Sequence, residues 1–214
     1  AVKVLVSQAR GAGRLEQAGE YLFAGKVLGF SAGVALILAV PFILPGLRLL
    51  VDSSQAAESA VVYFRIRVLS IPLLLMFVAT REYRYGMGDT RLPMVAGVVA
   101  NTLNIGLDYL FIMKLGMGVE GAAWATLVAV SLEWLIVLVP TWRPLLEGRR
   151  AGLIHLRSIV SIGTPSGFQF TLEMGSFTLL AAMIARLGDL EMAAHQIALQ
   201  IIHVAFLPVV SVGE

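Results

Sequence analysis

Long apolar runs separated by short polar segments dominate the chain. The runs cover residues 20–44, 61–80, 92–113, 120–140, 159–185 and 191–212. A run of about 20 apolar residues is long enough for a helix to cross a hydrocarbon core of roughly 30 Å. The runs are continuously apolar, whereas a transmembrane barrel would show alternating segments of about 10 residues. The pattern therefore predicts an all-α protein, a polytopic bundle of six transmembrane helices.

Composition strengthens this prediction and excludes other classes. Of 214 residues, 58% are hydrophobic and 14% are charged, whereas soluble domains average about 45–50% and about 25%. The net charge is only +2 and the basic residues are scattered between apolar blocks, so we expect no nucleic-acid partner. The absence of cysteine excludes disulfides and thiolate sites within the chain. The expected partner is a lipid bilayer, the cytoplasmic or inner membrane.

The distribution of basic residues predicts the orientation of the helices. Connections on one side carry Lys3, Arg10, Arg14, Arg81, Arg84, Arg91, Arg143, Arg149, Arg150 and Arg157. Connections on the other side, with the helix start that follows, carry only Arg48, Arg65, Arg67, Lys114 and Arg186. Cytoplasmic connections are enriched in Lys and Arg. The first side is therefore expected in the cytoplasm, and the first full helix runs outward.

The longest connection divides the chain. Residues 141–157 contain Pro144 and four arginines, which favours a cytoplasmic linker between helix groups at 1–140 and 158–214. Both ends of the sequence fall within apolar segments, so we expect a fragment of a longer protein. The segments VLVSQARGAG at the start and PVVSVGE at the end are weakly similar. This similarity favours a chain that covers about one repeat of a two-lobe protein and begins and ends at equivalent points of the two lobes.

A polar stripe marks the third apolar run. Asn101, Asn104 and Asp108 stand at i, i+3 and i+7, which places them on one helical face. Thr126 lies at a similar distance into the next run and is expected at the same depth. Carboxylate, amide and hydroxyl oxygens suit Na⁺, and an Asp with such neighbours equally suits a proton. The alternative is that the asparagines only join helices through hydrogen bonds.

A second candidate acid lies in the fifth run. Glu173 shares a face with Ser166, Gln169 and Ser176, and Pro165 lies two turns before it. A carboxyl group within an apolar span is costly, which favours a role in ion or proton binding. The alternative is a permanently protonated Glu173 whose own stripe satisfies it.

The remaining ionisable groups within the runs are assigned to structure. Lys26, Arg65 and Arg67 lie close enough to a predicted interface for their side chains to reach water. Packing roles are favoured for Glu133, which has apolar neighbours on its helix, and for His195 and His203. No phosphate loop, HExxH or GxSxG motif occurs, so we expect no enzyme.

An ordered set of segments resembles the multidrug and toxic compound extrusion (MATE) family. The segments are LVSQARGAG, REYRYGMGDTRLPM, NTLNIGLDYLFIMKLGMGVEGAAWAT, GTPSGFQFTLE and AAHQIALQI. The resemblance implies the end of helix 2 through most of helix 8 of a two-lobe, twelve-helix transporter. It also implies that Asn104, Asp108 and Thr126 match the amino-lobe cation site of the DinF-like branch. Glu173 matches the helix-7 acid of the NorM-like branch.

The function implied by the resemblance is antiport. Organic cations or drugs would be exported in exchange for H⁺ or Na⁺, without another cofactor, and the full-length protein would be monomeric. Asn101 and Gln169 are candidates for the substrate cavity. Two alternatives are a lipid-linked saccharide flippase of the same superfamily, which would need deep basic residues for a pyrophosphate, and an intramembrane enzyme.

Overall fold

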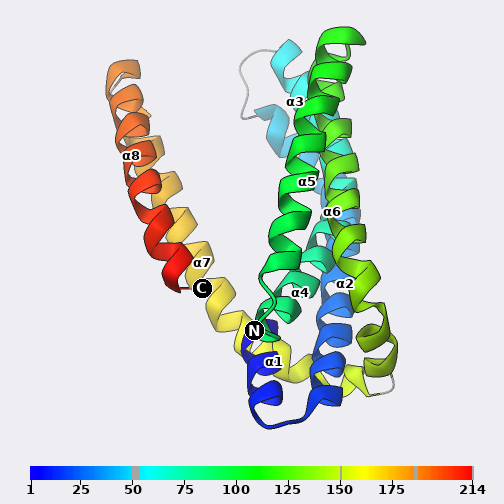
Figure 1. Ribbon diagram of the computed structural model, residues 1–214. Helices are drawn as coiled ribbons and strands as arrows, with labels where there is room; N and C mark the ends of the chain where they lie inside the picture. The colour runs from blue at the N-terminus through cyan, green and yellow to red at the C-terminus, as the bar shows by residue number, and fades with distance from the viewer. Residues whose placement is uncertain (50–53, 150, 186–187, 214) are drawn as a thin grey trace. The chain divides into compact units, whose positions relative to one another are not determined.

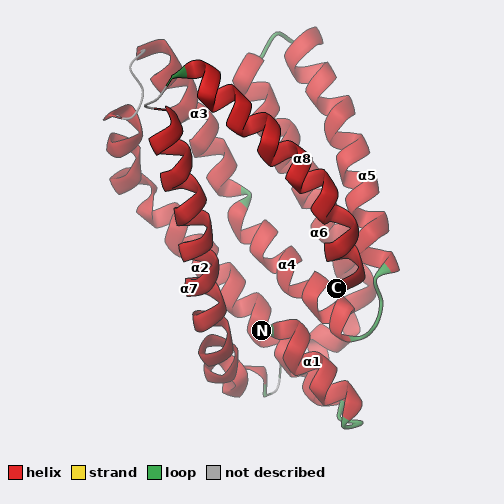
Figure 2. Cartoon of the chain, turned by 90° about the vertical axis from the view of Figure 1, so that its left-hand side faces the viewer, coloured by secondary structure: helices red, strands yellow, loops and turns green. Residues whose placement is uncertain are grey.

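The computed structural model describes residues 1–49, 54–149, 151–185 and 188–213, and every element among them is helical (Figures 1 and 2). This confirms the all-α prediction. Arg150 and Arg186, two of the basic residues used to predict the orientation, lie outside the described residues. The α-helices are α1 (Val2–Gly11), α2 (Leu15–Leu49), α3 (Ser54–Leu69), α4 (Ile71–Gly86), α5 (Arg91–Asp108), α6 (Gly118–Gly148), α7 (Leu156–Ala185) and α8 (Asp189–Gly213). A π-helix (Tyr109–Lys114) follows α5, and a 3-10 turn (Gly152–His155) precedes α7.

Four stretches of helix are long and apolar enough to cross a membrane: Leu15–Leu44, Arg91–Lys114, Gly118–Gly148 and Gly152–Ile184. They correspond to four of the predicted runs. A bent pair of helices, Glu58–Leu69 and Ile71–Gly86, can supply a fifth span. The sixth run forms α8, but many of its side chains lie outside the described part of the chain, so its role as a span stays a prediction. The chain is a multi-pass membrane protein.

The predicted helix at 61–80 is broken. α3 and α4 meet at Ser70 with a bend of 45°. Pro72 lies in the first turn of α4, where its missing N–H costs nothing, but its ring disfavours helical backbone just before it. The Ser70 hydroxyl donates to the Arg67 carbonyl at 2.7 Å and accepts from Arg67 Nη1 at 3.0 Å. Arg67 is therefore held at the bend, whereas Arg65 is exposed.

The helix α6 is longer than predicted and takes in half of the expected linker. It continues through Pro140 and Pro144 to Gly148. Thr141, fully buried, donates its hydroxyl to the Val137 and Leu138 carbonyls, the latter at 3.0 Å, inside this stretch. The division into groups at 1–140 and 158–214 stays a prediction. By internal contacts the chain forms one unit at Ala1–Ser161 and another at Ile162–Glu214.

The first unit is built on close contacts of α2 with α4 and α6, which lie side by side in Figure 1. A Cβ on Gly29 would lie 3.0 Å from the Leu75 carbonyl, so the small glycine favours this close approach of α2 to α4. One buried cluster joins α1, α2 and α4 around Val6, Leu22 and Tyr83. Another joins α4, α5 and α6 around Phe77, Ala96 and Val137. The second unit consists of most of α7 with α8.

Candidate functional site

The polar stripe lies on α5 and ends where the helix changes type. Asp108 is the last α-helical residue, and the π-helix begins at Tyr109. There the Leu115 amide donates to the Leu110 carbonyl, five residues earlier, at 2.9 Å. Single π-helical turns are common at functional sites because they shift side chains around the helix axis. Nothing in the apolar run at 92–113 predicted this change in the helix.

Two members of the stripe each have one buried polar atom without a partner among the described residues. Neither Asn104 Nδ2 nor Asp108 Oδ1 has accessible surface or a hydrogen-bond partner among the described residues. Asn101 differs, because it is exposed and its Nδ2 donates to the Gly97 carbonyl at 2.9 Å. The structure therefore separates Asn101, which bonds to its own helix, from Asn104 and Asp108, whose polar atoms remain available to a ligand.

Thr126 lies on α6, which packs against α5. Its hydroxyl donates to the Ala122 carbonyl at 2.8 Å, which leaves oxygen lone pairs free to accept. The turn between the two helices is short. Residues 108–114 before it and residues 118–126 after it are similar in length, as the predicted common depth of Asp108 and Thr126 requires. In the part of the chain that the structure describes, no hydrogen bond joins Thr126 to Asp108.

The chemistry of this site is that of one carboxylate with neutral oxygens. No cluster of three or more His, Asp or Glu side chains suited to a metal ion occurs among the described residues. One carboxylate with amide and hydroxyl oxygens nearby is chemistry that can bind a proton or Na⁺.

Glu173 and Gln169 lie in the second unit, on α7, and both are exposed. The serine hydroxyls on this face of α7 donate hydrogen bonds to carbonyls of their own helix. Ser166 donates to the Ile162 carbonyl at 3.3 Å, and Ser176 to the Leu172 carbonyl at 2.8 Å. These hydroxyl oxygens can still accept a hydrogen bond, so the alternative of a permanently protonated Glu173 satisfied by its own stripe stays a prediction.

Glu133, assigned to packing from its own helix, faces α5. Its Oε1 lies 3.5 Å from where a Cβ on Gly97 of α5 would be. Sequence reasoning missed this because it compared Glu133 only with neighbours on α6. His195 Nε2 is buried without a partner among the described residues, and the side chain of His203 lies outside them.

Lys26 was expected to reach water, and the structure contradicts this. Its side chain is 6% exposed, and its Nζ has no hydrogen-bond partner among the described residues. The ammonium lies 5.7 Å from the centre of the Trp134 ring. The helix α2 turns this residue towards α4 and α6, so a basic residue is present deep in the first unit.

Known proteins resemble this chain over nearly all its length. The MatE family matches residues 1–110. A probable multidrug resistance protein NorM of Pseudomonas putida is 30% identical over 97% of this chain and 47% of its own length. Protein DETOXIFICATION 43 of Arabidopsis thaliana is 33% identical over 83% of this chain and 34% of its own. The chain thus spans about half the length of the bacterial relative and about a third of the length of the plant relative.

Solved structures agree with the sequence matches. The outward-facing conformation of a multidrug resistance MATE family transporter of the MOP superfamily matches 98% of this chain and 48% of its own, with 25% identity and a TM-score of 0.83. The inward-facing conformation of such a transporter matches 66% of this chain and 32% of its own, with 28% identity and a TM-score of 0.61. With these matches, and with the helices and polar stripe described above, the chain belongs to the MATE family.

Proposed function

We propose that this chain is part of a cation-coupled antiporter that exports organic cations or drugs in exchange for H⁺ or Na⁺. The observation that carries the proposal is the buried acceptor Asp108 Oδ1, which has no hydrogen-bond partner among the described residues. A buried acceptor without a partner costs free energy, so the site gains when a proton or cation arrives. The names of the bacterial relatives, multidrug resistance proteins, support export of drugs.

Asp108, Asn104 and Thr126 have different roles in the proposed site. Asp108 binds the coupling ion, because it alone of the three can lose and regain its charge. Asn104 and Thr126 supply neutral oxygens from α5 and α6. Binding at Asp108 changes which hydrogen bonds it can make and so biases the packing of these helices. Gln169 and Asn101, both exposed, are proposed to contact the transported substrate.

Coupled efflux in proteoliposomes made with the full-length transporter tests the proposal. Asp108→Asn removes the titratable group while keeping its size, so drug efflux driven by a pH or Na⁺ gradient should be lost. Asn104→Ala and Thr126→Ala should weaken the dependence on the ion in a graded way. Thr102→Ala, on the same helix but with a hydroxyl that donates to the Val98 carbonyl of its own backbone at 2.8 Å, is the matched control and should keep the ion dependence. If Asp108→Asn retains the parent's gradient dependence, the coupling site is elsewhere.

A further inference from the structure

An apolar groove lies in the first unit between α2, α4 and α6. Its volume is about 320 Å³, and its walls include Phe23, Phe30, Met76, Trp134, Leu138 and Trp142. Phe30 and Trp142 are 51% and 50% exposed, so the groove opens to the outside of the unit. It uses none of the residues proposed to bind the coupling ion.

A single charged side chain lines this groove. Lys26 is 6% exposed, and its Nζ has no accessible surface and no hydrogen-bond partner in the described part of the chain. The described ion pairs do not include it either. The Trp134 ring, 5.7 Å away, offers a favourable but partial contact. A buried ammonium without an anion is costly, so the groove is complementary to a ligand that carries negative charge.

The apolar walls and the lone charge together specify an amphiphile. Basic pockets between transmembrane helices near the cytoplasmic side bind the head groups of anionic lipids. Lys26 lies in the first half of α2, on the side of the Arg-rich connections expected in the cytoplasm, and tryptophans are favoured near membrane interfaces. An organic cation would be repelled by Lys26.

We propose that this groove binds one anionic phospholipid of the cytoplasmic leaflet. The Lys26 side chain turns into the groove so that its Nζ pairs with the phosphate, and an acyl chain lies along Phe30, Trp134 and Trp142. The proposal does not rest on the transport activity, because Lys26 and the groove are distinct from Asp108 and its neighbours.

Native mass spectrometry of the purified full-length transporter tests this site. Phosphatidylglycerol and phosphatidylcholine with identical acyl chains are added in turn, with oleate as a third probe. The parent should retain one phosphatidylglycerol about tenfold more tightly than phosphatidylcholine, because both carry a phosphate but the trimethylammonium group of phosphatidylcholine cancels its net charge and is repelled by Lys26. Lys26→Met should lose this preference and Lys26→Arg should keep it. Ser31→Trp, which fills the groove from its rim without touching the charge, should weaken retention of both phospholipids.

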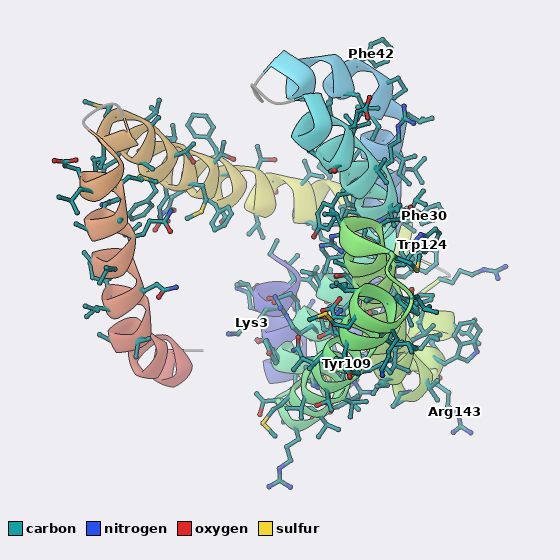
Figure 3. All side chains as sticks on the ribbon, turned by 90° about the horizontal axis from the view of Figure 1, so that it is seen from above. Lys3, Phe30, Phe42, Tyr109, Trp124 and Arg143 are labelled. Carbon is teal, nitrogen blue, oxygen red and sulfur yellow. The ribbon has the colours of Figure 1, made fainter. Side chains whose placement is uncertain are left out.

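Arg143→Met is the matched control. Arg143 is an exposed basic residue on α6 that projects outward and does not line the groove (Figure 3). Its loss removes the same charge and should leave the lipid preference unchanged. Thermal unfolding without added lipid verifies that each variant is folded. The proposal is overturned if Lys26→Met retains phosphatidylglycerol like the parent, if oleate displaces phosphatidylglycerol, or if the parent retains no lipid because another segment of the full-length protein fills the groove.

Discussion

His155 Nε2 lies 2.8 Å from Glu20 Oε2, which ties the turn after α6 to the first turns of α2. Both side chains are mostly buried, and the Tyr21 ring lies 4.6 Å from the imidazole. Gly152 of the same turn sits so close to α2 that a Cβ there would be 3.0 Å from the Glu20 carbonyl. The segment expected as a loose linker is therefore anchored to the first unit by side chains and by packing.

This pair should couple in a double-mutant cycle. His155→Ala and Glu20→Gln should each lower the free energy of unfolding by about 1 kcal/mol, because each removes one side of a partly buried polar contact. The double variant should cost less than the sum of the two, by up to about 1 kcal/mol. Thermal or denaturant unfolding in detergent measures this. Strictly additive effects would mean that the contact contributes nothing to stability.

Gly148 should tolerate no side chain. A Cβ there would meet the Gly19 carbonyl, at the place where the end of α6 crosses α2. Gly148→Ala should destabilise the protein by about 1–3 kcal/mol, because neither backbone can retreat without disturbing its helix. Gly106→Ala on α5 is the control, since nothing lies within 4 Å of its Cβ position and alanine favours a helix. A Gly148→Ala variant as stable as the parent would show that the two helices can separate at no cost.

The orientation of the helices in the membrane can be tested by labelling single cysteines. Arg14, in the turn between α1 and α2, and Leu115, in the turn before α6, are both exposed. With other cysteines removed from the full-length protein, Leu115→Cys should react with an impermeant maleimide in intact cells. Arg14→Cys should react only after the cells are opened, because it belongs to the Arg-rich side. Reaction of both in intact cells contradicts the predicted topology.

Substitutions of Glu173 can distinguish a role in ion binding from a role in packing in the second unit. Glu173→Gln keeps the size and hydrogen bonding of a protonated carboxyl but cannot titrate. A role in ion or substrate binding predicts loss of drug efflux at normal expression, measured in the same proteoliposome assay. Ser176→Ala is a suitable control, since this hydroxyl donates to its own helix at 2.8 Å. If Glu173→Gln transports like the parent and only Glu173→Leu fails, the residue is structural.

The sequence alone determined the class of protein and the positions of most helices. Continuous apolar runs in a charge-poor chain have no stable alternative to membrane-spanning helices, because each backbone group must be satisfied within its own segment. Spacing also placed Asn104 and Asp108 on one face, since that follows from the period of the helix. The break before Pro72 could have been read from the proline itself.

Which of these polar groups have partners depends on how the helices pack in three dimensions. Asn101 bonds to its own helix, whereas Asn104 Nδ2 is buried and has no partner in the described part of the chain, and spacing along α5 cannot distinguish the two. Lys26 was misassigned because distance along a helix gives depth but does not say whether lipid, water or another helix lies beside the side chain. Its burial depends on α4 and α6, distant in sequence, and on small residues that let the helices approach. Contacts between remote segments are set by packing, which hydrophobic periodicity does not record.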